Sequence, residues 1–106
     1  MKVDYKDYSK EVLAALEKGK RNALTAIGVT AETYAKQETP VDTGRLRNSI
    51  SHSVDGEAVY IGSNVEYAPY VELGTSRAKA HHMLQKAATE HTDEYKRLME
   101  DSMENA

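Results

Sequence analysis

The spacing of apolar residues predicts a long amphipathic helix over residues 9–38. Apolar side chains recur there every three or four positions, which places them along one stripe of a helix. The stripe contains Val12, Leu16, Ala23, Leu24, Ile27, Ala31, Tyr34 and Ala35. Ser9 can cap the first turn, and Pro40 ends the helix. Such a helix is roughly 45 Å long at 1.5 Å per residue, so we expect part of it to extend beyond the core.

An alternating pattern follows and predicts a strand over residues 45–54. The even positions carry Leu46, Asn48, Ile50, His52 and Val54, and the odd positions are all polar. Asp55-Gly56 then predicts a type I′ hairpin turn, in which both central residues have positive φ. The resulting register pairs Val54 with Glu57, His52 with Val59 and Ile50 with Ile61. One face would carry the aliphatic residues and a core-edge His52, whereas Tyr60 would join the serines on the other face.

The segment after the hairpin predicts a short helix and then a loop. Residues 69–73, PYVEL, fit about one helical turn. Pro69 suits the first helical position, and Gly74 suits the left-handed residue after the last. Residues 74–81 show no apolar periodicity, so we expect a flexible loop there.

A second amphipathic helix is expected from His82 to about Met103. Its apolar side carries Leu84, Ala87, Ala88, His91, Tyr95, Leu98 and Met99. Residues 1–106 are therefore expected to form one α+β domain, frayed at residues 1–8 and 101–106. Its parts are a long N-terminal helix, a small antiparallel sheet based on a β-hairpin, a short connecting helix and a C-terminal helix packed on the sheet.

The apolar inventory indicates a thin core. Val, Ile and Leu number eight, three and seven, Phe and Trp are absent, and seven tyrosines carry hydroxyls that need partners. Small domains with few aliphatic residues often gain stability by association, so we expect an oligomer. Without cysteine the chain has no disulfide framework and no thiolate metal site. No apolar run reaches the roughly 18 residues of a membrane span, and the N-terminal residues do not resemble a signal peptide.

The net charge of −3 is unevenly distributed. Residues 90–106 contain six acidic and two basic groups, whereas the charges of the rest of the chain nearly balance. Nucleic-acid binding needs a concentrated positive surface. We therefore expect no direct sequence-specific contact with nucleic acid.

Candidate catalytic and cofactor-binding groups do not form a convincing site. VDTGRL has a single glycine and no following Lys-Ser or Lys-Thr, so it is not a phosphate-binding loop. The candidate metal ligands are His81, His82, His91, Glu72 and Glu90. The two adjacent histidines would point about 100° apart on a helix, and His91 could share an ion only with Glu94. We expect no metal, no cofactor and no catalytic residue.

Glu72 stands out among the carboxylates because Val71 and Leu73 flank it. A carboxylate in an apolar setting needs a partner or a shifted pKa. Arg45 or Arg47 could supply a bidentate partner. An ion pair that fixes a loop or a subunit contact is favoured over a catalytic role.

Two motifs together resemble a known family. TPVDTGRLRNSI contains Pro-x-x-Thr-Gly-x-Leu-x-x-Ser, and YAPYVELGT contains Tyr-Ala-x-x-Val-Glu-x-Gly-Thr. The matching positions are Pro40, Thr43, Gly44, Leu46, Ser49, Tyr67, Ala68, Val71, Glu72, Gly74 and Thr75. In this order the motifs resemble the small tail-component, or head–tail joining, proteins of long-tailed bacteriophages and prophages. The resemblance covers residues 39–88 and extends to the flanking helices only in type.

One departure from the family concerns the start of the last helix. Relatives usually carry Pro-Phe-Leu followed by Pro-Ala, where this chain has His82, Met83, Leu84, Lys86 and Ala87. Met83 and Leu84 can take over the apolar docking role. Without the prolines, the loop and the helix start are expected to be less rigid.

The resemblance implies a structural virion assembly protein and not an enzyme. It also implies that the protein is present in the host cytoplasm during assembly and then in the neck or tail of the virion. Such proteins form rings that complete the tail or join it to the capsid connector. The implied partners are further copies of the chain and the phage connector, neck and tail proteins, with DNA passing through the ring. The candidate interface and motif residues are Thr43, Gly44, Arg45, Arg47, Ser49, Tyr60, Tyr67, Tyr70, Glu72, Gly74, Thr75, Arg77, His82 and Met83.

Two surfaces are expected to make the ring contacts. One is the face that carries Arg45, Arg47, Ser49, Ser51 and Tyr60, and the other is the loop at residues 74–82. Two alternative functions are considered. The chain could be a small adaptor or regulatory protein-binding domain of the same fold, or a metal-dependent enzyme.

Overall fold

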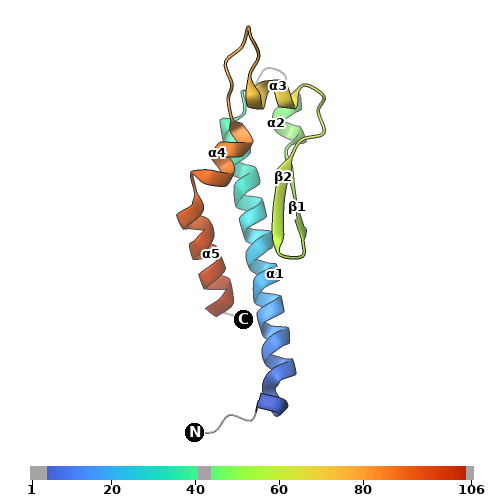
Figure 1. The fold of residues 1–106 in the computed structure, drawn as a ribbon, viewed down its shortest axis with the longest axis vertical. Helices are drawn as coiled ribbons and strands as arrows, with labels where there is room; N and C mark the ends of the chain where they lie inside the picture. Colours follow the sequence, from blue (N-terminus) through green and yellow to red (C-terminus); the bar gives the residue numbers. More distant parts are fainter. Residues whose placement is uncertain (1–4, 41–43, 105–106) are drawn as a thin grey trace.

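The computed structural model describes residues 5–40 and 44–104 of the chain. Its elements are α1 (Tyr5–Glu38), α2 (Arg45–Ser49), β1 (Ser51–Asp55), β2 (Ala58–Gly62), α3 (Ala68–Leu73), α4 (Met83–Thr89) and α5 (Thr92–Glu104). Helix α1 runs the length of the molecule, with the hairpin along one side and α4 and α5 along the other (Figure 1). The α+β class is confirmed, and the C-terminal helix α5 packs chiefly against α1.

Helix α1 extends beyond the elements that cover it. The molecule measures 66 × 23 × 20 Å, and its radius of gyration is 18.2 Å, whereas a compact domain of about 100 residues has a radius of about 13 Å. Val12 is 51% exposed near the uncovered end, and Ala23 is fully buried further along. The expected overhang is therefore confirmed (Figure 1). The helix begins at Tyr5, so Ser9 lies inside it, and the prediction that Ser9 caps the first turn is wrong.

The predicted strand over residues 45–54 is wrong in its first half. Residues Arg45–Ser49 form helix α2, preceded by Gly44 at φ +83°, and the strand begins only at Ser51. Leu46 and Ile50 are both buried. Their spacing of four satisfies a strand alternation and one helical turn equally well, which explains the error.

The hairpin forms with a register different from the predicted one. Asp55 pairs with Ala58, so the two-residue turn is Gly56-Glu57 in place of Asp55-Gly56. Gly56 has φ +61°, and Glu57 does not have positive φ, which is the pattern of a type II′ turn. The shift moves the pairing by two residues, so each side chain keeps its predicted face.

The two faces of the hairpin therefore differ as expected. The pairs Val54–Val59 and His52–Ile61 lie on the half-buried face, and Ser53–Tyr60 lies on the exposed face. Both strands contact α1. The hairpin is in effect an amphipathic two-stranded layer on one side of the long helix.

The predicted C-terminal helix is interrupted, because α4 ends at Thr89 and α5 begins at Thr92. Two tyrosine contacts surround the break. The Tyr34 ring stacks on His91 at a centroid distance of 3.5 Å, and the Tyr95 hydroxyl donates to the Ala87 carbonyl. The interruption turns α5 back along α1, as Figure 1 shows. Ala88, predicted on the apolar side, is exposed.

The core lies at the end of the molecule where α1 stops. Ile50 and Met83 are its largest fully buried side chains. The core cluster consists of Ala35, Leu46, Ile50, Val65, Ala68, Met83 and Ala87. It is therefore made mostly of small side chains, in agreement with the composition, and it brings α2, α3 and α4 together.

Candidate functional site

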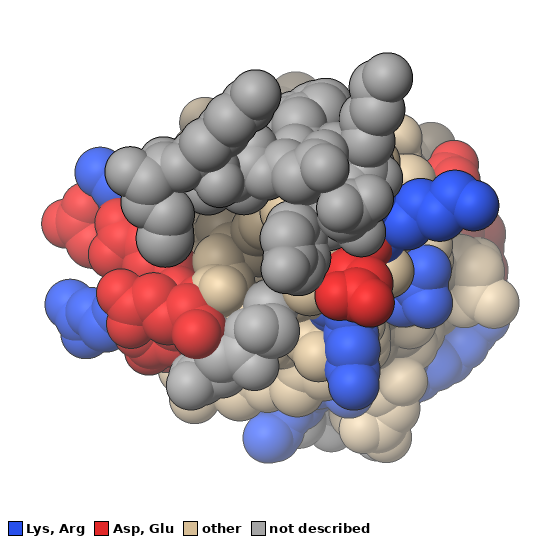
Figure 2. Space-filling view, turned by 90° about the horizontal axis from the view of Figure 1, so that it is seen from below, with Lys and Arg blue, Asp and Glu red and all other residues tan. Residues whose placement is uncertain are grey.

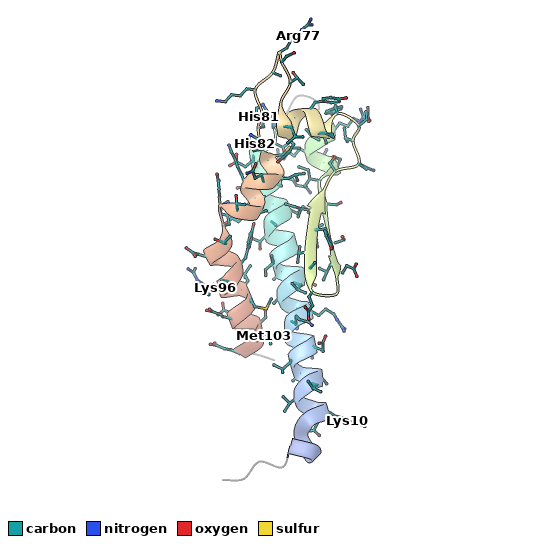
Figure 3. All side chains as sticks on the ribbon, viewed as in Figure 1. Lys10, Arg77, His81, His82, Lys96 and Met103 are labelled. Carbon is teal, nitrogen blue, oxygen red and sulfur yellow. The ribbon has the colours of Figure 1, made fainter. Side chains whose placement is uncertain are left out.

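The two sequence motifs meet at the core end of the molecule. Helix α2 carries the end of the first motif, α3 carries the second, and the loop that follows α3 projects beyond both (Figure 1). Thr43 lies outside the described residues. Figure 3 shows Arg77 at the tip of this loop and His81 and His82 at its base.

Arg45 forms a bidentate ion pair with Glu66, which the sequence did not reveal. Its two guanidinium nitrogens lie 3.1 and 2.9 Å from the Glu66 carboxylate oxygens, and the guanidinium carbon lies 5.5 Å from the Tyr67 ring centre. The pKa of the Glu66 carboxyl is lowered by its own backbone N–H and then by Arg45. Of the two arginines that the sequence offered as partners for Glu72, Arg45 pairs with Glu66 instead. Arg45 instead ties α2 to the segment before α3.

Glu72 uses its carboxylate to cap helix α4. Its two oxygens accept hydrogen bonds from the backbone N–H groups of Leu84, at 2.8 Å, and Gln85, at 3.1 Å. These groups belong to the first turn of α4, where backbone donors have no partner inside the helix. The expectation that Glu72 needs a partner is confirmed, and the partner is a helix terminus. A negative charge at this position also interacts favourably with the helix dipole.

The loop after α3 is built on a closed base. Gly74 has φ +78°, and a Cβ at this position would lie 2.7 Å from the backbone nitrogen of Ala80. The backbone N–H of His81 donates to the Val71 carbonyl at 2.9 Å. Inside the loop, the Thr75 hydroxyl accepts from the backbone N–H groups of Arg77 and Ala78. The segment therefore leaves and rejoins the domain at defined points.

His82 joins the loop to α4 in an unusual backbone conformation. It is the one residue other than glycine with positive φ in the described part of the chain, at φ +50°. Its N–H donates to the Glu72 carbonyl, whereas its Nδ1 atom is buried without a partner in the described residues. Met83, the next residue, is fully buried and accepts a hydrogen bond from the Thr39 hydroxyl. The expected transfer of the docking role to Met83 is thus confirmed.

The remaining candidate residues are divided between the surface and the interior. Arg47, Tyr60 and Tyr70 are exposed. Ser49 is half-buried, donates to the Leu46 carbonyl at 2.6 Å and contacts the Ser63 hydroxyl, so it does not belong to the exposed face predicted for it.

His52 connects the hairpin to α1, as its predicted core-edge position suggests. Its Nδ1 atom lies 3.2 Å from the Glu32 carboxylate, and its ring fills the space beside Gly28. The His52 hydrogen bond is the main cause that lowers the pKa of Glu32, and Lys36 acts in the same direction. Gly28 and Glu32 carried no site signal in the sequence, because their role depends on the position of the hairpin.

In the part of the chain that the structure describes, the titratable groups do not assemble into a metal site. Within residues 5–40 and 44–104 no three His, Cys, Asp or Glu side chains are placed to hold an ion. His91 stacks on Tyr34, and Glu94 accepts a hydrogen bond from the Tyr34 hydroxyl. In the same ranges, no helix is long and apolar enough to span a membrane.

Charged side chains of both signs are spread unevenly over the surface. Viewed from the N-terminal end of α1, a group of acidic side chains lies at the left with basic ones beside it, and basic side chains predominate at the right, where acidic ones also occur (Figure 2). Helix α5 exposes Glu100 and Glu104 together with Lys96 and Arg97. The hairpin side exposes Arg47 together with Asp55 and Glu57.

Comparison with known proteins identifies the family. The family described as "Bacteriophage HK97-gp10, putative tail-component" matches residues 5–74, a range that includes α1, the hairpin and α3. No curated protein and no solved structure gives a significant match. The match covers more than half of the chain and includes the first motif and the second motif as far as Gly74. The chain therefore belongs to the HK97-gp10-like family of bacteriophage tail components.

Proposed function

We propose that this tail component forms part of the neck or of the head-proximal end of the tail, where copies assemble into a ring that completes the tail or joins it to the capsid connector. The observation that carries the proposal is the family match over residues 5–74. An elongated subunit with different surfaces on its two sides supports it, because ring contacts require one patch to meet a different patch on the next subunit.

The exposed face of the hairpin and the adjacent α2 is the proposed joining surface. Ser51, Ser53 and Tyr60 lie on the side of the sheet that faces away from α1, and Arg47 is exposed on α2. Tyr60 is 57% exposed although it is large and aromatic. Tyrosine and arginine are enriched among the interface residues that contribute most of the binding free energy.

The loop at residues 74–82 is the second proposed joining surface. Arg77 and Lys79 are exposed on it, and residues 74–82 contain no acidic side chain. Its hydrogen-bonded base places these cations at a fixed end of the subunit. A docking site on the next ring would then need acidic groups to receive the loop.

Charge reversal at Arg47 tests the joining surface. Arg47→Glu should leave the protein folded, because the side chain is exposed, but it should block the joining of heads to tails in infected cells. Plaque counts and electron microscopy of lysates would measure this, with unjoined heads and tails as the expected product.

Lys96→Glu provides a matched control. It makes the same change of charge on exposed α5, which lies on the other side of α1 from the hairpin, and joining should continue. Normal virion yield from the Arg47→Glu phage would contradict the proposed surface.

A further inference from the structure

The last helix of the subunit is held differently from the helix before it. Met83 and Ala87 on α4 are fully buried in the core cluster. Helix α5 has no buried residue along its described length, and it packs chiefly against α1 (Figure 1). The half-buried positions from residue 91 onward follow one helical stripe, which consists of His91, Glu94, Tyr95, Leu98, Met99, Ser102 and Met103. Helix α4 is therefore anchored in the core, whereas α5 is attached along one side only.

The break between α4 and α5 has no cause in the local sequence. Residues 83–104 contain no glycine and no proline, the residues at which helices most often kink. Glu90 keeps right-handed helical backbone angles, with φ −87° and ψ −9°. The apolar positions 84, 87, 88, 91, 95, 98 and 99 keep helical spacing across the break, and they include Ala88, which is exposed here. The local sequence therefore favours one continuous helix.

Tyrosine contacts hold the break in place. In a continuous helix the Ala87 carbonyl would accept a hydrogen bond from the backbone N–H of His91, four residues further on. Here the Tyr95 hydroxyl donates to that carbonyl, and a side chain that enters the backbone ladder in this way kinks a helix. On α1, the Tyr34 ring stacks on His91, and its hydroxyl donates to Glu94. The bend therefore depends on the docking of α5 against α1.

We propose that α5 is exchanged between copies, so that α4 and α5 straighten into one helix and α5 packs on α1 of the next subunit. The structure specifies the occupant of the vacated α1 surface, because α5 of the same chain already fits it. Exchange of an identical element reuses the α1–α5 contacts and is a low-cost route to assembly. Because each subunit gives its helix to one neighbour and receives one from the other, the contact is heterologous and can close into a ring. This inference rests on the proposed ring assembly and names its subunit contact.

A proline at residue 92 tests the hinge. Thr92 is the first residue of α5, a position that suits proline because the N–H there has no partner inside the helix. In a straight α4–α5 helix the same proline would lie in the interior and break the helix. Thr92→Pro should therefore keep the circular dichroism of the wild type but prevent assembly, measured by sedimentation of the concentrated protein and by incorporation into tails. Thr92→Ala, the matched control, should assemble as the wild type does.

Tyr95→Phe should act in the opposite direction. It keeps the aromatic ring and removes the hydroxyl that occupies the Ala87 carbonyl, so the straight helix becomes easier to form. Larger species should then appear at a lower protein concentration than in the wild type. Normal assembly of Thr92→Pro, or assembly of Tyr95→Phe that is no stronger than that of the wild type, would contradict the hinge.

Photo-cross-linking measures the exchange directly and decides the case in which Thr92→Pro does not fold. The photoreactive analogue p-azidophenylalanine in place of Tyr34 keeps the ring and puts the reactive group beside Glu94. Irradiation of dilute protein should join residue 34 to α5 of the same chain, which migrates as a monomer on a denaturing gel. Irradiation of purified tails should join it to α5 of a neighbour and give a ladder of dimers and larger species. Cross-links within single chains in the tails, or no cross-link to α5 in either sample, would overturn the proposal.

The outcome for the proposed function is read separately. Tails that contain the protein and show cross-links within single chains would overturn the exchange while the proposed function stands. Wild-type tails that lack the protein would contradict the proposed function, whereas a ladder in the concentrated purified protein would still support the exchange.

Discussion

The His52 ring lies so close to Gly28 that a Cβ at residue 28 would be 2.5 Å from the imidazole Cδ2. Glycine in the middle of a helix costs up to about 1 kcal/mol relative to alanine. Here it allows β1 to approach α1 closely enough for His52 to reach Glu32, one turn further along the helix. The missing side chain is thus part of how the hairpin is attached.

Gly28→Ala should therefore destabilise the protein in spite of the better helix propensity of alanine. We expect a net loss of about 1–2 kcal/mol, because overpacking a filled site typically costs more than the helix gains. Urea unfolding followed by circular dichroism would measure the change.

A matched double variant checks the cause. In a His52→Ala background the clash is absent, and Gly28→Ala should then stabilise the protein by up to about 1 kcal/mol. An increase in stability from Gly28→Ala in the wild-type background would refute the explanation.

The Glu32–His52 contact should also make stability depend on pH. The hydrogen bond with His52 lowers the pKa of Glu32 below its usual value, so the unfolded chain binds this proton more tightly than the folded protein does. The contact therefore adds its full contribution to the free energy of unfolding above the usual glutamate pKa of about 4.3. This contribution is lost as the pH falls through the lower pKa that Glu32 has in the folded protein. We expect Glu32→Gln to reduce stability at neutral pH and to flatten the decline below about pH 5.

Urea unfolding at a series of pH values would test this expectation. Glu90→Gln is a suitable control, because Glu90 is exposed and its replacement should leave the shape of the pH profile unchanged. If Glu32→Gln and the wild type lost stability in parallel on acidification, the contact would not be the cause.

Local signals in the sequence predicted the long helix, the hairpin and α3. Pro69 and Gly74 bracket α3, and the apolar stripe of α1 is visible without any tertiary information. Prediction failed where the deciding contacts are distant. The break between α4 and α5 coincides with the Tyr34–His91 stack, which joins residues far apart in the sequence.

The candidate site was also predicted only in part, because the partners of its residues are distant in the sequence. An apolar setting indicates that Glu72 needs a partner, but only the folded chain shows that the partner is the first turn of α4. Arg45 was recognised as a carboxylate ligand, although its partner Glu66 carries no pattern that distinguishes it from other exposed glutamates. Residue types can thus be read from the sequence, whereas their pairing depends on the arrangement of α2, α3 and α4.

Removal of the Glu72 cap should weaken the start of α4. Glu72→Ala leaves the N–H groups of Leu84 and Gln85 without their acceptors, and loss of a helix cap costs about 1–2 kcal/mol. Glu72→Gln should cost less, because its amide oxygen can still accept one of the two hydrogen bonds. Thermal unfolding would measure both changes.

The Glu66→Ala variant separates capping from a general loss of negative charge. Glu66 pairs with Arg45 on the exposed surface, where ion pairs contribute little to stability. We expect a much smaller effect than for Glu72→Ala. Equal effects of the two alanine variants would argue against the capping role.

The positive φ of His82 can be tested with two substitutions that remove the same side chain. At φ +50° alanine keeps the steric cost of a Cβ, whereas glycine does not. His82→Gly should therefore be more stable than His82→Ala by about 1 kcal/mol. The difference isolates the backbone, because both variants lose the imidazole and its buried Nδ1 atom. Urea unfolding would measure the free energy of unfolding of both variants. A more stable His82→Ala variant would show that residue 82 is not held in the left-handed region. The same pair of substitutions at exposed Lys96, inside α5, should reverse the order, since alanine is favoured over glycine within a helix.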